Sequence, residues 1–167
     1  SDLRREQEAD GSWFGRWGAN YIYGTWSALA GLNAAGVPRT DPAMARAAEW
    51  LKRQQRADGG WGEGLETYAP EVRGFARAST PSQTAWAMLG LMAAGEANAI
   101  EVTKGARWLA EAPRDGARWR EEHYTGTGFP RVFYLRYHGY AAYFPAWALA
   151  RHDGLKGRND PRVEWGL

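Results

Sequence analysis

A short pattern that ends in tryptophan occurs twice in this chain, 48 positions apart, and constrains the fold more than any other feature. Gln7–Trp13 and Gln55–Trp61 share the order Gln, two residues, Asp, Gly, a small residue and Trp. A degenerate third copy, Pro113–Trp119, ends 58 positions later and has Pro in place of Gln. Repetition at such a period is typical of folds built from one repeated supersecondary unit.

A second repeated segment alternates with the first. Thr25–Gly36 matches Thr84–Gly95, and both are apolar stretches that stop at glycine, a usual helix ending. Asp41 before Pro42 is a typical helix start. We therefore expect an all-α fold of repeated helix pairs that pack side by side. The predicted helices cover residues 23–35, 42–56, 80–95, 100–112 and 130–151, with a long loop at 62–78 and no sheet.

Composition limits the possible chemistry. Lys and Arg number 21 against 19 Asp and Glu, a balance that argues against a nucleic-acid partner. Cysteine is absent, which excludes disulfides, thiolate nucleophiles and cysteinyl zinc sites. We expect neither a secretory leader nor a membrane span. The unusual quantity is the aromatic content: 10 Trp, 8 Tyr and 5 Phe, enough for rings to serve packing, binding or both.

The repeated Gln and Trp positions are interpreted as structural. A Gln amide at a helix end can bond to backbone groups that lack intrahelical partners, while the Trp ring stacks on that side chain. This interpretation predicts structural staples, not catalytic groups, at Gln7, Trp13, Gln55, Trp61 and Trp119.

Aromatic residues spaced by four, four and three positions surround Pro130 and follow it. If Pro130 begins a helix, this spacing places four rings on one helix face. From the residues alone, buried core is the favoured interpretation, and it extends to Phe144 and Trp147, with a kink at Pro145. The four rings belong to Phe129, Phe133, Tyr137 and Tyr140.

The blocks around these patterns resemble the squalene–hopene cyclase family of the terpene-cyclase superfamily, in which the Gln–Trp repeat is called the QW motif. In chain order they are Gly11–Thr25, Gly59–Glu63, Ser79–Trp86 and Tyr124–Pro130. Together they cover nearly the whole chain in the family's order, so the resemblance is specific. It implies a toroid of inner and outer helices, with residues 1–152 as part of its C-terminal domain and 153–167 as a polar tail.

The resemblance further implies a triterpene cyclase of hopanoid biosynthesis, which protonates squalene or a related linear polyprenoid and guides the carbocation through ring closure. Family members supply the proton from the central Asp of an Asp-x-Asp-Asp motif, and this sequence contains no such motif. We therefore expect a C-terminal segment that is inactive alone, with the acid upstream. No metal or organic cofactor is expected. Family members are peripheral, monotopic proteins, so we expect the cytoplasmic face of a bacterial membrane.

By the same resemblance, the aromatic stripe lines a substrate cavity. Phe129 and Phe133 are expected to stabilise the cation, because aromatic faces attract positive charge, whereas a carboxylate would trap or deprotonate it. Tyr137 and Tyr140 would shape the cavity, and Trp17 would form a wall that faces developing charge.

Tyr23 is expected to support the hydrogen-bond network of the upstream acid. The other polar members of these blocks are given structural roles. These are Asn20 and Tyr21, together with a partly buried, bracing charge pair of Arg16 and Glu63. The three His residues have no metal-ligand spacing, and His138 is expected to be solvated.

Two other interpretations remain open. One is a class II diterpene cyclase segment, although the block from Phe129 to Tyr140 favours a triterpene cavity. The other is a binding or scaffold module that docks a partner on its aromatic surface. Protein prenyltransferases share the helical ring but need a cysteine-containing zinc site, which is excluded here. An incomplete ring exposes helices, so we expect the isolated segment to self-associate.

Overall fold

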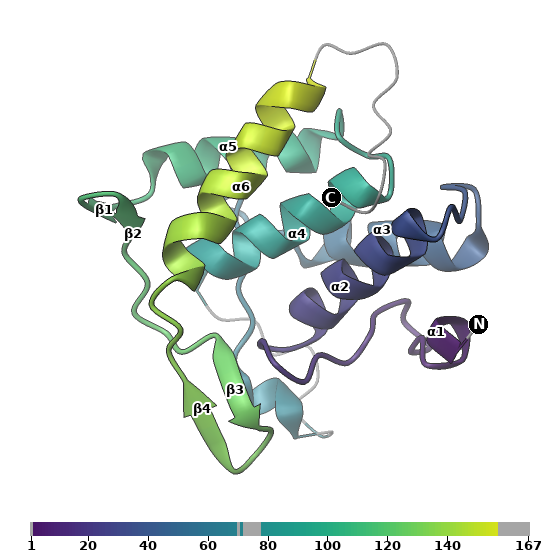
Figure 1. Cartoon of the computed structure of the whole chain (residues 1–167), viewed down its shortest axis with the longest axis horizontal. Helices are drawn as coiled ribbons and strands as arrows, with labels where there is room; N and C mark the ends of the chain where they lie inside the picture. The colour runs from purple at the N-terminus through teal and green to yellow at the C-terminus, as the bar shows by residue number, and fades with distance from the viewer. Residues whose placement is uncertain (1, 70, 72–77, 157–167) are drawn as a thin grey trace.

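The computed structural model describes residues 2–69, 71 and 78–156. Helices predominate, as the repeats predict (Figure 1). In chain order the elements are α1 (Asp2–Arg5), α2 (Tyr21–Ala34), α3 (Pro42–Gln54), the 3-10 helix η1 (Leu65–Tyr68), α4 (Pro81–Ala93), α5 (Ile100–Glu111), β1 (Arg114–Asp115), β2 (Arg118–Trp119), β3 (Gly126–Phe129), β4 (Phe133–Leu135) and α6 (Tyr140–Leu155).

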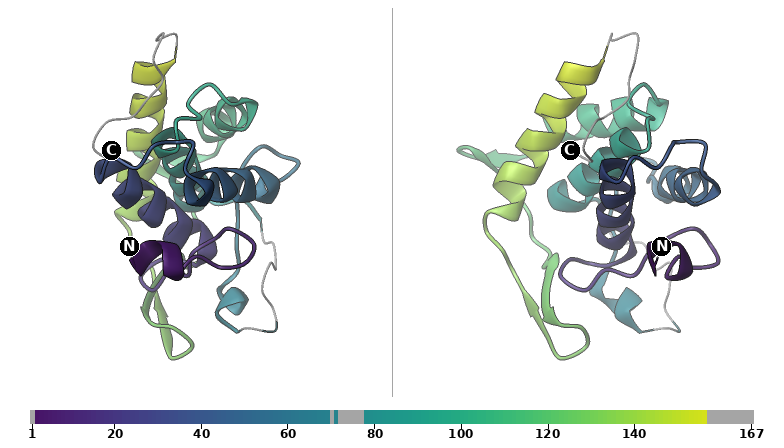
Figure 2. Two further views of the ribbon diagram at one scale, coloured as in Figure 1. Left: turned by 90° about the vertical axis from the view of Figure 1, so that its right-hand side faces the viewer. Right: turned by 45° about the vertical axis from the view of Figure 1, so that its right-hand side comes forward.

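The long helices form two layers. Helix α4 lies between α2 and α6, and these three helices make the inner layer (Figure 1). Helix α3 packs on α2 and α4, and α5 packs on α4 and α6, so that the outer layer lies on one side (Figure 2). Every residue of α4 is buried, and the core is therefore centred on this helix. The repeated helix pairs are α2 with α3 and α4 with α5.

Local sequence explains where these helices begin and end. The Asp41 carboxylate accepts a hydrogen bond from the Ala43 N–H at 2.9 Å, which caps α3. Gly36 and Gly95 follow α2 and α4 with φ of +76° and +81°. After each glycine the next N–H bonds back to a carbonyl five residues earlier, so α2 and α4 end in the same Schellman motif.

A β-hairpin occupies residues 126–135, so the predicted helix over 130–151 is wrong in its first part, and the expectation of no sheet is wrong too. Strands β3 and β4 pair antiparallel, and β1 and β2 form a second short ladder. Gly128 permits the pairing, because a Cβ there would lie 2.0 Å from the Phe133 ring. Arg131 turns the tip with φ of +68°. Aromatic and β-branched residues after the tip favour extended backbone, and α6 begins only at Tyr140.

The four rings predicted to share one helix face therefore lie on different elements. Phe129 ends β3, Phe133 begins β4, Tyr137 lies in the connection, and Tyr140 is the first residue of α6. Helix α6 continues through the buried Pro145. The first three residues of the predicted tail, 153–155, belong to α6, and residues 157–167 lie outside the described part.

Candidate functional site

The segment around Trp17 joins the edge of the hairpin. The Ala19 N–H donates to the Thr125 carbonyl at 2.8 Å, and the Thr127 N–H donates to the Trp17 carbonyl at 3.3 Å. Gly18 and Gly126 face each other as an isolated bridge between these bonds. Backbone pairing thus brings Trp17 to the hairpin that carries two of the predicted cavity rings.

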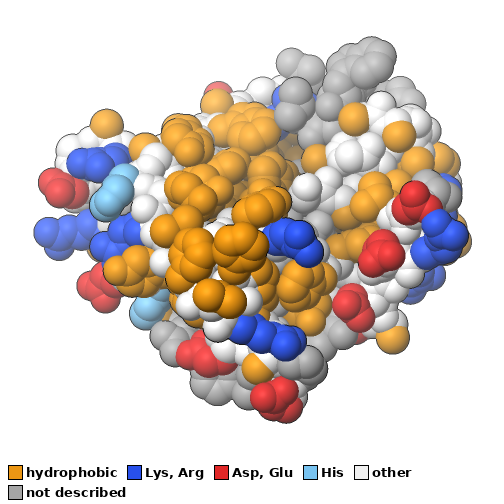
Figure 3. All heavy atoms as spheres, turned by 60° about the horizontal axis from the view of Figure 1, so that its bottom comes forward, with side chains coloured by type: hydrophobic (Ala, Val, Ile, Leu, Met, Phe, Trp, Pro, Cys, Tyr) orange, Lys and Arg blue, Asp and Glu red, His pale blue; other side chains and the backbone are white. Residues whose placement is uncertain are grey.

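These rings are exposed. Trp17, Phe129 and Phe133 have 52%, 62% and 43% of their surface accessible to solvent, unusually high fractions for large apolar side chains. The Phe129 and Phe133 rings meet edge to face with centroids 5.6 Å apart. Seen from the hairpin side, apolar side chains cover much of the surface, with a few basic and acidic groups among and around them (Figure 3). A patch of this kind is typical of a surface that another part of the protein or an apolar ligand covers.

Three tyrosines continue the aromatic surface towards the inner helices. The Tyr137 and Tyr140 rings lie 4.8 Å apart, and Tyr140 and Tyr23 both meet Trp86 edge to face, at 5.6 and 5.0 Å. Burial, with the neighbouring tyrosines, raises the pKa of Tyr140 to about 12. Burial and the proximity of Tyr137 also raise the pKa of Tyr23. Both phenols therefore stay neutral at physiological pH and add no negative charge.

A backbone glycine makes room for Tyr23. A Cβ on Gly18 would lie 2.3 Å from the Tyr23 ring. The turn after Trp17 can therefore lie directly on the first turn of α2. The structure joins Tyr23 and Tyr140 through Trp86, with Tyr137 against Tyr140. It brings Trp17 to the hairpin that carries Phe129 and Phe133.

Glu63 supports the start of α2. Its carboxylate accepts hydrogen bonds from the backbone N–H groups of Asn20, Tyr21 and Ile22 at 3.0–3.2 Å. These N–H groups have no intrahelical acceptor, and a carboxylate at this end also meets the positive pole of the helix dipole. Burial raises the pKa of Glu63, although these hydrogen bonds oppose the rise.

The predicted charge pair between Arg16 and Glu63 is wrong. Arg16 is exposed, and no ion pair in the described part of the chain joins it to Glu63. The physical reason is that the helix N-terminus already supplies the positive partner. Asn20 itself is buried, with its side chain bonded to the Gly15 N–H and the Thr67 carbonyl.

Gln83 is a buried residue whose role the sequence did not suggest. Its amide nitrogen donates to the carbonyls of Ala19 and Glu63, at 3.0 and 2.9 Å. Its amide oxygen accepts from the Glu63 N–H at 3.1 Å. The side chain therefore ties α4 to two of the segments that carry the site, and only its polarity inside an apolar helix marked it in the sequence.

The repeated Gln residues make the same contacts in both copies. Gln7 donates to the carbonyls of Gly11 and Ala43, both at 2.9 Å. Gln55 donates to the carbonyls of Gly59 and Glu101, at 2.9 and 2.8 Å. Each amide thus links its own turn to the first residues of the next outer helix.

The repeated Trp residues also share one contact. Each indole N–H donates at 2.7 Å to the carbonyl ten residues earlier, from Trp13 to Leu3, Trp61 to Leu51 and Trp119 to Leu109. All three side chains are almost fully buried. Every polar atom of these indoles therefore has a local partner, which suits a structural role.

A further pair of tryptophans also belongs to the repeat and was not predicted from the sequence. Trp50 and Trp108, on the outer helices, donate to the carboxylates of Asp10 and Asp58 at 3.1 and 3.2 Å. The two tryptophans are 58 positions apart, the same interval as Trp61 and Trp119. That shared interval was the signal available in the sequence.

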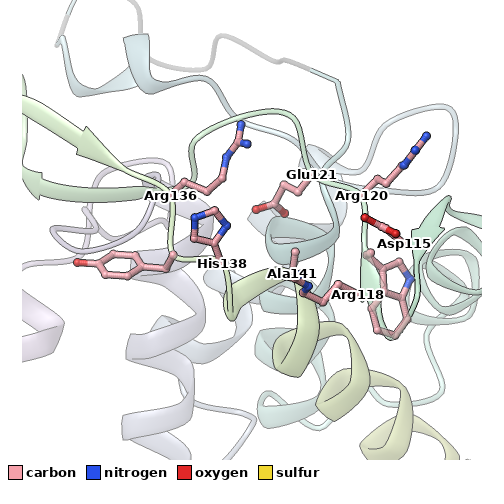
Figure 4. Close-up of a pocket in the computed structure, with 9 residues that line it drawn as sticks. Asp115, Arg118, Arg120, Glu121, Arg136, His138 and Ala141 are labelled. Carbon is pink, nitrogen blue, oxygen red and sulfur yellow. The ribbon is translucent and has the colours of Figure 1, made fainter.

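Glu121 repeats the position of Glu63, two residues after a repeated Trp. Its carboxylate accepts from the Ser82 N–H at 2.8 Å, at the first turn of α4. It borders a cavity of about 210 Å³ that is also lined by Arg118, Arg120 and Arg136. The side chains of Arg136 and Arg120 lie on either side of Glu121 and do not point towards each other, so their charges do not converge (Figure 4). His138 lies on the same cavity and is exposed, as the sequence predicts.

Two further properties bear on the site. Within residues 2–69, 71 and 78–156, no group of three or more His, Asp or Glu side chains is arranged to hold a metal ion. No helix among these residues is both long and apolar enough to cross a bilayer.

Fold and site together define a helical-repeat protein in which an exposed aromatic surface lies beside the inner layer of helices. Residues 1–154 match the family described as the squalene-hopene cyclase C-terminal domain. The chain is 58% identical to the squalene–hopene cyclase of Zymomonas mobilis and 52% identical to that of Bradyrhizobium diazoefficiens, over 99% of this chain and 25% of each relative. It is 44% identical to dammaradiene synthase of Dryopteris crassirhizoma, over 90% of this chain and 24% of that protein.

The chain therefore belongs to the squalene-hopene cyclase C-terminal domain family. It spans about a quarter of the length of the curated relatives it matches.

Proposed function

We propose that this chain is the C-terminal part of a squalene–hopene cyclase, and that the intact enzyme cyclises squalene or a related linear polyprenoid in hopanoid biosynthesis. Family membership and the names of the relatives from Zymomonas mobilis and Bradyrhizobium diazoefficiens support this proposal. The helix pairs would form part of an (α/α) toroid that the rest of the chain completes. The acid that starts the reaction would come from outside this segment, so the segment alone would be inactive.

The observation that carries the proposal is the exposed aromatic surface. A cation that moves along a folded hydrocarbon needs stabilisation that does not remove its proton, and neutral rings provide it. A desolvated cation–ring contact is worth about 2 kcal/mol, which corresponds to roughly a 30-fold effect on rate. Phe129 and Phe133, at the outer end of the surface, would face the developing charge.

The remaining rings would define the shape of the cavity. Tyr137 and Tyr140 pack closely together and would orient the forming rings, and the raised pKa of Tyr140 keeps its phenol neutral. Trp17 would form the facing wall, and Tyr23 would support the hydrogen-bond network of the acid. No cofactor is needed for protonation and cation–ring contact. Since the substrate is a membrane lipid, the intact enzyme would lie on the cytoplasmic face of a bacterial membrane.

The test uses the full-length cyclase that contains this segment. Phe129→Leu, Phe133→Leu and Trp17→Leu keep an apolar side chain but remove the aromatic face. We expect each to lower turnover of squalene by about 10- to 100-fold and to raise the share of incompletely cyclised products, measured by gas chromatography. Leu155→Met, in the core at the far end of α6, is the control for apolar substitution. Unchanged turnover and products in all three variants would refute the proposed role.

The 44% identity to a dammaradiene synthase supports a second candidate, a triterpene cyclase with a different product. The same product analysis of the parent enzyme separates the two. A class II diterpene cyclase would accept a shorter polyprenoid instead of squalene. A scaffold module would turn over neither squalene nor the shorter polyprenoid.

A further inference from the structure

Glu121 joins three segments through one carboxylate. One oxygen, Oε2, accepts from the Ser82 N–H at 2.8 Å, and the other, Oε1, accepts from the Ser82 and Thr125 hydroxyls at 3.0 and 3.1 Å. Ser82 belongs to the first turn of α4, and Thr125 is the residue just before β3. The carboxylate thus ties the base of the aromatic hairpin to the central helix.

Thr125 is also the point at which the hairpin meets the Trp17 segment. Its carbonyl accepts the Ala19 N–H at 2.8 Å, and the bridge between Gly18 and Gly126 follows directly. A change in the position of Thr125 would therefore move two aromatic elements together. The tip of the hairpin has its own anchor, the bond from Arg131 Nε to the Tyr68 carbonyl at 2.7 Å.

The distance from Thr125 to the rings amplifies small movements. An extended strand rises about 3.3 Å per residue, so Phe129 lies roughly 13 Å beyond Thr125. A tilt of about 5° over this distance amounts to about 1 Å. Because Arg131 holds the tip, the displacement falls on the strand between the two anchors, which carries Phe129, and misplacement of that size can cost about 100-fold in rate. The base contact therefore matters for chemistry although Glu121 does not reach the rings.

We infer that Glu121 is a positioning residue: it holds the hairpin against α4 so that Phe129 and Phe133 face the charge that develops during the cyclisation. This inference rests on the proposed function. Its distinguishing consequence is a change in product pattern, because rings that are displaced but still present fail mainly at the ring closures they serve.

The experiment compares products of the full-length cyclase and its variants with squalene as substrate. Glu121→Ala removes all three contacts, and Thr125→Val removes only the contact to the hairpin. We expect each to raise the incompletely cyclised fraction at least 5-fold, with a KM within about 2-fold of the parent. The double variant should be no worse than Glu121→Ala, since both changes break the same link. Glu121→Gln keeps an acceptor and a donor in place and should restore at least half of the parent pattern.

Glu122→Ala is the matched control, because this neighbouring residue is exposed and its hydrogen bond within the described residues is from Arg136 to its backbone carbonyl, which the substitution leaves in place. If Glu121→Ala does not fold, Thr125→Val decides, since it leaves both Ser82 contacts intact. Parent-like products from Thr125→Val, or the same loss in Glu121→Gln as in Glu121→Ala, would overturn the inference. If the Phe129→Leu and Phe133→Leu variants also keep the parent pattern, it is the proposed function that fails.

Discussion

At the scale of single residues, two buried carboxylates fix the starts of two of the three inner helices, a role that the QW residues do not have. Glu63 serves α2 and Glu121 serves α4, each two residues after a repeated Trp. Burial raises the pKa of both groups, against the opposing effect of their hydrogen bonds. The contribution of these two carboxylates to the free energy of unfolding therefore depends on pH, unlike that of an exposed carboxylate whose pKa does not change on folding.

Glu63→Gln tests this dependence. Because the folded-state pKa lies above the ordinary value of 4.5, the folded state holds more protons than the unfolded chain in the window just above pH 4.5. The contribution of Glu63 to the free energy of unfolding is therefore full below that window and declines as pH rises through the folded pKa. The free energy of unfolding of the parent should therefore decrease relative to that of Glu63→Gln as the pH rises, by at most about 1.4 kcal/mol per pH unit.

Urea unfolding between about pH 4 and pH 7 measures this difference. Glu111→Gln, at an exposed position on α5, controls for the loss of one negative charge. A difference that stays constant, or grows as the pH rises, would contradict the assignment.

At the scale of elements, the inner helices touch their neighbours through glycines. A Cβ on Gly24 of α2 would lie 2.3 Å from the Trp13 carbonyl oxygen, so the first QW turn rests directly on the helix. Gly31 lies on the same helix with only a Leu3 methyl at 3.9 Å. Packing therefore requires glycine at position 24 but not at position 31.

Gly24→Ala and Gly31→Ala form a matched pair on α2. At Gly24 the new methyl must displace backbone, which costs about 1–3 kcal/mol and outweighs a helix-propensity gain of about 1 kcal/mol. At Gly31 the gain stands alone, so we expect a rise in stability of about 0.5–1 kcal/mol. Thermal and urea unfolding measure both. Equal effects of the two substitutions would show that the close approach at Gly24 is not a constraint.

At the scale of the whole molecule, the three inner helices and the hairpin leave an aromatic surface uncovered. Trp17, Phe129, Val132 and Phe133 are all exposed, and Val132 at the hairpin tip has 76% of its surface accessible. Because this chain spans about a quarter of its relatives' length, we propose that upstream repeats enclose this surface in the intact enzyme, so that it becomes one wall of the substrate cavity.

The isolated segment is expected to self-associate through this surface, because apolar area of this kind seeks another apolar surface. Light scattering across a range of concentrations measures the effect, and Val132→Glu should shift the equilibrium towards monomer. Lys104→Glu, at an exposed position on α5, is the charge control. A segment that stays monomeric at high concentration would contradict the expectation.

Much of the fold could be predicted from the sequence because its signals are local. Asp41 with Pro42, and the glycines after α2 and α4, determine helix ends within a few residues. The aromatic spacing from Phe129 to Tyr140 gave a wrong prediction because it too was read locally, and locally it fits a helix. The extended backbone found there depends on contacts across the hairpin, above all that of Gly128 with Phe133.

The sequence by itself determined the repeat, the helix pairs and the supply of aromatic side chains, since periodicity and turn residues act over short distances. Tertiary structure alone decided that the hairpin pairs with the Trp17 segment and that Glu63 meets a helix start some 40 residues earlier, where Arg16 was expected. Such contacts depend on which backbone groups remain unpaired once the helices have packed, and no local pattern encodes that.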